Sequence, residues 1–154
     1  MPAAAAAAAT GHRLPASAFH VEVSDGADRA ALLIDGDPET RWLTGRPQSG
    51  DEWIRITFDR PCDVSRLELQ VTSRSFGDYP RELTIDALDP RGVTTTLFHA
   101  PMLVPFGRVL ATGSAQPALT VSLPSNRTRT LTIRQTGRAR RWFWSVHELA
   151  MFER

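Results

Sequence analysis

Apolar residues recur at every second position along much of the chain, which is the pattern of β-strands with one buried face. The clearest example is residues 53–58, and a second alternating stretch, residues 64–71, follows after a short polar turn. We expect these two stretches to form a hairpin. Further strands are predicted at residues 19–23, 83–88, 94–99, 108–111, 119–123, 130–135 and 143–152.

Only residues 28–33 have a helix-like pattern, and at 3.6 residues per turn this segment makes about one and a half turns. A crossover between parallel strands needs about a dozen residues or more, so the sheets should be antiparallel. Many short strands separated by Pro, Gly, Asp and Ser turns are typical of sandwiches and barrels. The pattern therefore predicts an all-β protein, an antiparallel β-sandwich of jelly-roll topology.

The length of 154 residues, with 42% hydrophobic residues, suits one domain with a single core. Residues 1–17 are rich in Ala, Thr, Gly, Pro and Ser and are expected to be a disordered linker or the edge of an excised module. The β-sandwich domain should then span residues 18–154. No run of about 18 apolar residues predicts a membrane span, and the start lacks the features of a secretory signal.

The 18 basic residues are all arginine and are balanced by 17 acidic residues, giving a formal net charge of +1. Because the arginines are scattered, apart from a group at 138–141, the sequence does not predict a nucleic-acid partner. Cys62 is the one cysteine, which excludes an internal disulfide and a thiolate metal site.

Two short polar segments stand out against this background. Residues 34–42 place Asp35, Asp37, Glu39 and Thr40 around a tight Gly-Asp-Pro turn, where their oxygens suit a hard cation such as calcium. The alternative is that the same side chains cap the turn. Residues 144–149 place Glu148 inside an apolar terminal strand, where an unpaired charge would be costly. Contact between the two segments would explain that charge.

Four segments in order, residues 31–42, 53–56, 78–81 and 144–149, resemble the discoidin, or coagulation-factor type C, family, which includes family 32 carbohydrate-binding modules. The resemblance runs from about residue 18 to 153 and implies a galactose-binding-like β-sandwich. It also implies a structural calcium between the early loop and the last strand. Its ligands would be the Leu32 carbonyl, the Asp35 carboxylate, the Asp37 carbonyl, the Thr40 carbonyl and hydroxyl, the His147 carbonyl and the Glu148 carboxylate.

The resemblance further implies that Trp42, Trp53 and Trp144 pack in the core. Sugar-binding relatives recognise their ligand through loops at one end of the sandwich, here residues 44–51, 72–79 and 137–142. The candidate ligand-binding residues in these loops are Arg46, Gln48, Arg74, Phe76, Arg138, Arg140, Arg141 and Trp142. The histidines and asparagines that often read sugar hydroxyls are missing from them.

We therefore expect a non-catalytic binding module for carbohydrate or a surface polymer, monomeric by itself, carried by a larger bacterial protein outside the cytoplasm. The alternative is a structural accessory domain that packs on its own parent chain, a surface or membrane-bound carbohydrate-active enzyme. The missing sugar-reading residues favour this second hypothesis.

Membrane contact and catalysis are less favoured. The apolar run at residues 101–106 is expected to be an edge strand or a packed loop, although its exposure would indicate an apolar membrane spike. Ser145, His147 and Glu148 are the ingredients of a nucleophilic triad. In a regular strand, however, Glu148 lies on the opposite face from the other two and cannot orient the histidine. The sequence thus predicts no enzyme activity.

Overall fold

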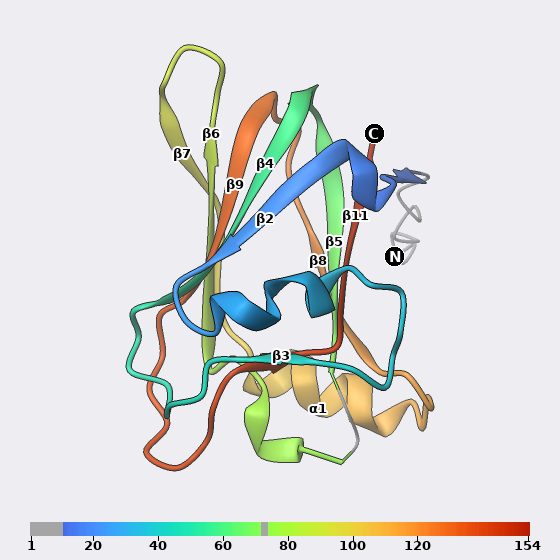
Figure 1. Cartoon of the computed structure of the whole chain (residues 1–154), viewed down its shortest axis with the longest axis vertical. Coiled ribbons are helices and arrows are strands. Elements are labelled where there is room, and N and C mark those ends of the chain that lie inside the picture. Colours follow the sequence, from blue (N-terminus) through green and yellow to red (C-terminus); the bar gives the residue numbers. More distant parts are fainter. Residues whose placement is uncertain (1–10, 72–73) are drawn as a thin grey trace, which may run out of the picture.

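The computed structural model describes residues 11–71 and 74–154, and within them two antiparallel sheets face each other (Figure 1). The first sheet has the order β2-β4-β9-β6-β7, formed by Phe19–Val23, Glu52–Cys62, Thr128–Gln135, Glu82–Leu88 and Thr94–Pro101. The second has the order β1-β11-β5-β8, formed by His12–Arg13, Glu148–Glu153, Val64–Gln70 and Ala118–Ser122. The predicted all-β antiparallel sandwich is confirmed.

The core lies between the two sheets, because alternation along each strand turns one set of side chains inward. In the five-stranded sheet Ile133 of β9 pairs with Ile54 of β4 on one side and Ile85 of β6 on the other, and all three are fully buried. In the four-stranded sheet Leu69 of β5 pairs with Leu149 of β11.

A third, two-stranded sheet joins the early and late segments of the chain. Its strands are β3 (Trp42–Leu43) and β10 (Ser145–Val146), and the 3-10 helix η2 (Ala27–Leu33) precedes it. Trp42 and Trp144 are fully buried, and their rings meet edge to face at 5.1 Å between centroids. Both tryptophans therefore pack in the core, as the resemblance implied. The predicted continuous strand at residues 143–152 is instead divided between β10 and β11.

The prediction that Trp53 also packs in the core is wrong. It lies on the outer face of β4, partly exposed, with the guanidinium of Arg55 4.4 Å from its ring centroid. The alternation itself accounts for this position, because Ile54 faces inward and its neighbour must face outward.

The predicted hairpin between residues 53–58 and 64–71 is also wrong. β4 pairs with β2 and β9, whereas β5 pairs with β11 and β8, so the chain changes sheet at Asp63. A period of two identifies a strand but not its partner. The consecutive strands β6 and β7, in contrast, do pair as a hairpin.

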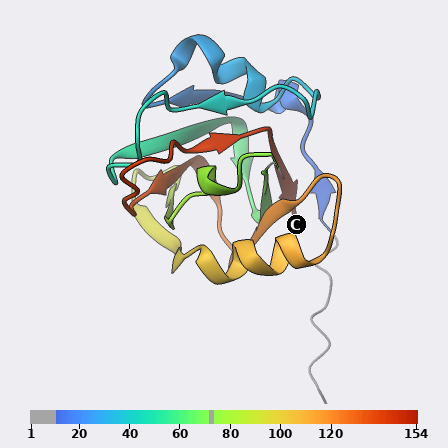
Figure 2. The same ribbon diagram turned by 90° about the horizontal axis from the view of Figure 1, so that it is seen from below.

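A further correction concerns residues 101–111, for which an edge strand or loop and then a strand were predicted. β7 ends at Pro101, and Leu103–Ala111 form the helix α1. Pro105 lies in the first turn of this helix, where a missing backbone N–H costs no intrahelical hydrogen bond. Figure 2 shows α1 and η2 on opposite sides of the lower end of the sandwich.

The domain also begins earlier than the predicted boundary at residue 18. β1 pairs with β11, placing His12 opposite Glu153, and the buried Leu14 donates its backbone N–H to the Met151 carbonyl at 2.8 Å. Residues 11–17 are therefore part of the sandwich. The rest of the predicted linker, residues 1–10, lies outside the described residues.

Candidate functional site

The three loops predicted to hold a ligand meet at the lower end of the sandwich, where buried Gln48 joins them. Its side-chain amide donates to the carbonyls of Tyr79 and Phe143, both at 3.0 Å, and its side-chain oxygen accepts the Arg81 N–H at 3.1 Å. Its backbone N–H donates to the Trp142 carbonyl at 3.0 Å. One glutamine thus holds the ends of all three loops together.

An exposed pair of aromatic residues lies on these loops. Trp142 is 48% exposed and Phe76 is 56% exposed, whereas the other aromatic side chains are buried or half-buried. The indole of Trp142 lies directly against Gly77, where any β-carbon would overlap the ring. We call Phe76, Gly77 and Trp142 the aromatic platform.

The loop that carries Phe76 and Gly77 includes the 3-10 helix η3 (Phe76–Asp78) and is held by two arginines. Arg41 donates to the Asp78 carboxylate at 3.1 Å, and Arg81 donates to the Gly77 and Tyr79 carbonyls, both at 2.8 Å. Burial raises the pKa of Asp78, and the charge of Arg41 opposes that rise. These contacts fix the backbone on which the indole rests.

Positive charge surrounds the platform. Arg138, Arg140 and Arg141 are exposed, and none makes a hydrogen bond or ion pair within residues 11–71 and 74–154. Arg74 is also exposed and forms an ion pair with Glu39 at 3.4 Å. The guanidinium groups of Arg138, Arg140 and Arg141 are available to donate hydrogen bonds to hydroxyl or anionic groups of a ligand.

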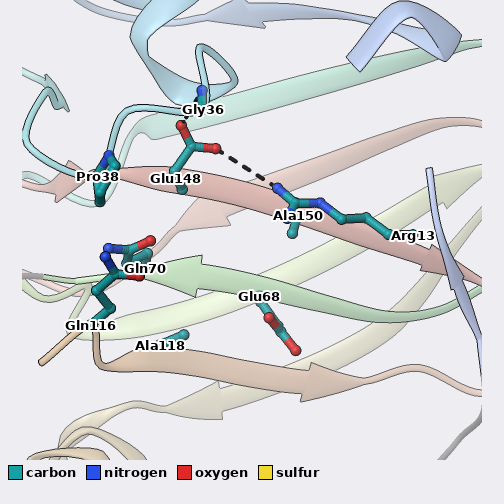
Figure 3. Close-up of a pocket in the computed structure, with 9 residues that line it drawn as sticks. All are labelled: Arg13, Gly36, Pro38, Glu68, Gln70, Gln116, Ala118, Glu148 and Ala150. Carbon is teal, nitrogen blue, oxygen red and sulfur yellow. Dashed lines mark hydrogen bonds and ion pairs between the residues drawn. The ribbon is translucent and has the colours of Figure 1, made fainter. Parts of the chain in front are cut away.

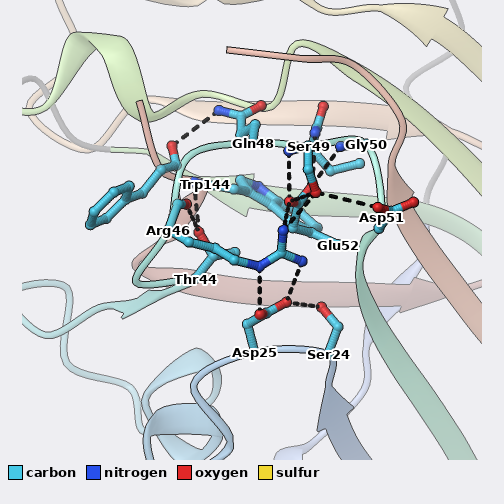
Figure 4. Close-up of polar contacts among 12 residues, drawn as sticks. Ser24, Asp25, Thr44, Arg46, Gln48, Ser49, Gly50, Asp51, Glu52 and Trp144 are labelled. Atoms are coloured by element: carbon cyan, nitrogen blue, oxygen red, sulfur yellow. Dashed lines mark hydrogen bonds and ion pairs between the residues drawn. The ribbon is translucent and has the colours of Figure 1, made fainter. Parts of the chain in front are cut away.

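Arg46, the remaining predicted ligand-binding residue, forms polar contacts within the protein that hold its loop in place (Figure 4). Its guanidinium contacts the Asp25 carboxylate at 2.8 Å, the Ser49 hydroxyl at 2.6 Å and the fully buried Glu52 at 3.2 Å. The hydrogen bond from Arg46 lowers the pKa of Asp25. Burial would raise the pKa of Glu52, but hydrogen bonds, chiefly from Ser49, hold it below its usual range.

The two polar segments at opposite ends of the sequence meet in space. The Glu148 carboxylate accepts the Gly36 backbone N–H at 2.7 Å, and His147 Nδ1 donates to the Pro38 carbonyl at 2.7 Å. Arg13 lies 4.0 Å from the same carboxylate. The charge of Glu148 therefore has partners, as its position in an apolar strand required.

Four of the oxygen groups expected to ligate calcium lie near one another at this junction, namely the Asp35 and Glu148 carboxylates, the Thr40 hydroxyl and the Asp37 carbonyl. The Thr40 hydroxyl lies 2.8 Å from the Asp35 carboxylate and 3.0 Å from the Asp37 carbonyl, and the Asp37 N–H donates to Asp35 at 3.0 Å. Burial raises the pKa of Glu148, and the nearby Asp35 carboxylate raises it further. Two facing carboxylates with carbonyl and hydroxyl oxygens beside them fit a hard cation.

A triad is not assembled from Ser145, His147 and Glu148. Ser145 donates to Asp78 at 3.3 Å, whereas His147 and Glu148 contact the early loop. Within the described ranges, 11–71 and 74–154, no three or more His, Cys, Asp or Glu side chains form a cluster suited to a metal ion. A cation at the junction would therefore depend on backbone and hydroxyl oxygens.

The apolar run at residues 101–106 is partly buried and partly exposed. Met102 and Phe106 are buried, and Phe106 stacks on Tyr79 at 4.3 Å between centroids. Leu103 and Val104, in the first turn of α1, are 66% and 61% exposed. In the part of the chain that the structure describes, no helix is long and apolar enough to cross a membrane.

Sequence reasoning missed Gly77, the residue that allows the indole to lie flat. A glycine two residues before Tyr79 carries no local signal of a ring that comes from residue 142. The close approach depends on the arrangement of two loops that are far apart in sequence.

Comparison with protein-family models gives no match. Among curated proteins, an α-(1→3)-arabinofuranosyltransferase of Mycobacterium tuberculosis is 28% identical over 95 residues, which is 58% of this chain. The aligned part covers 7% of the length of that relative.

Solved structures define the class of fold. The module CpGH89CBM32-5 of Clostridium perfringens, in complex with GalNAc-β-1,3-galactose, is 12% identical with a TM-score of 0.72 and covers 92% of this chain and 99% of its own. The family 32 carbohydrate-binding module of C. perfringens NanJ, in complex with galactose, is 16% identical with a TM-score of 0.71, covering 92% and 98%. A chitosan-binding module from Paenibacillus sp. IK-5 is 18% identical, with a TM-score of 0.66 and coverage of 92% and 98%. The chain thus has the galactose-binding-like β-sandwich fold of these modules.

Proposed function

We propose that this chain is a non-catalytic carbohydrate-binding module whose aromatic platform stacks on a sugar ring. The observation that carries the proposal is the exposed Trp142 indole, supported from beneath by Gly77 and flanked by Phe76. A sugar has an apolar C–H face and a polar rim, and an aromatic ring beside the guanidinium groups of Arg138, Arg140 and Arg141 complements both. The sugars in the complexes of two structural neighbours, galactose and GalNAc-β-1,3-galactose, support this class of ligand.

The parent protein is proposed to be a larger bacterial carbohydrate-active enzyme that faces the outside of the cytoplasm. The support is the arabinofuranosyltransferase relative, in which the matched part is a small fraction of the length. A binding module in such a protein would hold the glycan near the catalytic part. Recognition of an extended glycan by a module on the same chain raises its local concentration there.

Titration of glycans against the isolated chain tests the platform. Galactose-containing and arabinose-containing oligosaccharides are added while binding heat and tryptophan fluorescence are followed. Trp142→Ala should weaken binding by about tenfold or more, because it removes the stacking surface, whereas Trp142→Phe should retain part of the affinity. Val93→Ala is a matched control, since Val93 is an equally exposed apolar residue that lies outside the platform. Equal affinities for Trp142→Ala and the control would reject the platform.

The second candidate is an accessory domain that packs on its parent. It is favoured by the exposed Leu103 and Val104 on α1 and by the loops that lack histidine and asparagine. In that case no glycan binds, and the double variant Leu103→Ser/Val104→Ser weakens association with the parent chain. If the same variant instead reduced binding to phospholipid vesicles, the exposed pair would be a membrane contact.

We also propose a structural calcium at the junction, held by Asp35, Thr40 and Glu148 together with the carbonyls of residues 32, 37, 40 and 147. The support is the set of convergent oxygens and the two facing carboxylates. Calcium at about one hundred times its dissociation constant would stabilise the fold by about 2.7 kcal/mol, which corresponds to a rise in Tm of about 5–10 °C.

Thermal melting in calcium and in chelator measures this shift. Asp35→Asn should abolish it, because one of the two carboxylates is lost. Asp89→Asn is the matched control: Asp89 likewise caps a turn, accepting the Arg91 and Val93 N–H groups, but lies in the β6–β7 hairpin. A wild-type Tm that is the same in both solutions would reject the calcium site.

A further inference from the structure

The outer face of the four-stranded sheet contains a groove that lies apart from the aromatic platform (Figure 3). It crosses β11, β5 and β8 and encloses about 330 Å³, a volume in the range of small-molecule sites. A smaller hollow of about 110 Å³ continues it, sharing Pro38, Gln70 and Gln116 as lining residues.

The strand register explains why the face is hollow there. Ala150 of β11 is paired with Glu68 of β5, and Ala118 of β8 is paired with Gln70. The small side chains on β11 and β8 therefore lie beside the long polar side chains of β5, the strand between them. Glu148, paired with Gln70 on the other side, completes the polar wall.

The groove holds polar groups that can still form hydrogen bonds with a ligand. The side-chain amides of Gln70 and Gln116 have no hydrogen-bond partner among residues 11–71 and 74–154. Glu68 lies 3.3 Å from Arg66 Nε, and Glu148 is held by Gly36, so both carboxylates keep oxygens that can accept. Two free amides between two carboxylates can read hydroxyl groups as donors and as acceptors.

The groove lacks the aromatic surface that the platform provides. Across the described ranges no Phe, Tyr or Trp side chain lines either part of it. A pyranose in its chair form presents a broad C–H face that stacks on an aromatic ring, whereas the C–H face of a puckered furanose ring is smaller and less flat, so it gains less from stacking. The groove offers hydrogen-bonding groups instead, the amides, the carboxylates and the Arg13 guanidinium, with His147 and Arg74 in the smaller hollow. Such a site suits furanose rings recognised through their hydroxyls.

We propose that this groove is a second glycan site that binds a neutral furanosyl oligosaccharide, an inference that rests on the proposed function of the chain as a carbohydrate-binding module. Each carboxylate of the groove has an arginine beside it, Arg66 at 3.3 Å from Glu68 and Arg13 at 4.0 Å from Glu148, so the charges are balanced and an uncharged occupant fits. Three neighbouring strands span about 10 Å, which leaves room for a short oligosaccharide rather than a single sugar ring. The smaller hollow reaches Arg74, so the groove ends at the loop that carries Phe76.

The test compares two probes on the full chain, a short arabinofuranosyl oligosaccharide and a galactose-terminated pyranosyl oligosaccharide. Binding is measured by calorimetry, and the side-chain amide signals of Gln70 and Gln116 are followed by NMR. The double variant Gln70→Ala/Gln116→Ala should weaken furanosyl binding roughly tenfold through the loss of two hydrogen-bonding groups, and leave pyranosyl binding and Tm unchanged. Thr120→Ala is the matched control, because Thr120 is exposed on the same sheet next to the groove but does not line it.

The outcomes separate the groove from the platform. Furanosyl binding that survives Trp142→Ala and is lost in the double variant supports the groove. Furanosyl binding that is lost in Trp142→Ala but not in the double variant overturns the groove and leaves the proposed function standing. If neither probe binds, both proposals fail. If the glutamine signals respond to protein concentration and not to sugar, the groove holds a second copy of the chain and the inference is overturned.

Discussion

At the scale of single residues, the platform depends on the absence of one side chain. Trp142 is exposed at the end of a loop, a position where a large side chain usually samples several rotamers. Contact with Gly77 restricts the indole to one orientation, and Arg81 and Arg41 fix the backbone beneath it. Because the ring is already restricted before binding, less conformational entropy is lost when a ligand binds.

The variant Gly77→Ala tests this restriction. The added methyl group would overlap the indole, so Trp142 must leave its position, and affinity for the platform ligand should fall by about tenfold. Tryptophan fluorescence should change in the absence of ligand for the same reason. Unchanged affinity and an unchanged spectrum would contradict the orientation described for Trp142.

Gly107→Ala is the control for that variant. Gly107 lies in α1 with open space around its α-carbon, so a methyl group meets no neighbour. It should leave binding unchanged and stabilise the helix by about 0.5–1 kcal/mol, since alanine loses less backbone entropy than glycine.

At the scale of elements, the sequence predicted the strands well because alternation is a local property. It failed at α1, where two helix-disfavouring residues, Pro105 and Gly107, lie in a short segment. A helical signal is nevertheless present: Met102, Phe106, Val109 and Leu110 recur at helical spacing, and all four contact the core. The pairing of β4 and β5 with other strands had no such signal, because partners are selected by the whole core.

The same reasoning separates the parts of the candidate site. The junction of residues 34–42 with 144–149 could be predicted, because a carboxylate in an apolar strand needs a partner. The groove could not, since it results from the register of three strands that are distant in sequence.

Helix α1 should contribute to the stability of the loop end through one aromatic contact. Phe106 is buried and stacks on Tyr79, so Phe106→Ala should lower the free energy of unfolding by about 3–5 kcal/mol. Leu103→Ala, on the exposed side of the same helix, should change it by less than about 0.5 kcal/mol. Urea unfolding measures both. Similar losses for the two variants would mean that α1 packs with a different face.

At the scale of the whole molecule, the two sheets are linked at the end opposite the platform by Glu153, near the C-terminus. Arg60 at the end of β4 donates two hydrogen bonds to this carboxylate, at 2.7 and 2.6 Å, while His12 of β1 lies 3.4 Å away. The hydrogen bonds from Arg60 hold the pKa of Glu153 below its ordinary value of 4.5. The Glu153 carboxylate of β11 therefore connects β4 of the five-stranded sheet with β1 and β11, the two strands at one edge of the four-stranded sheet.

This contact makes stability depend on acidity with a definite sign. Because the pKa of Glu153 is lower in the folded chain than in the unfolded one, its contribution is complete above 4.5 and is lost as the pH falls through the folded value. Arg60→Gln removes the cause of the lowering, so its Tm should be below that of the wild type at about pH 7 and should converge with it at an acid pH below the folded pKa of Glu153. Arg154→Gln, which breaks an exposed ion pair with Asp63 at 3.3 Å, is the control and should follow the wild type across this range. A constant difference in Tm between Arg60→Gln and the wild type at both pH values would show that Arg60 stabilises the chain by packing and not through the Glu153 charge.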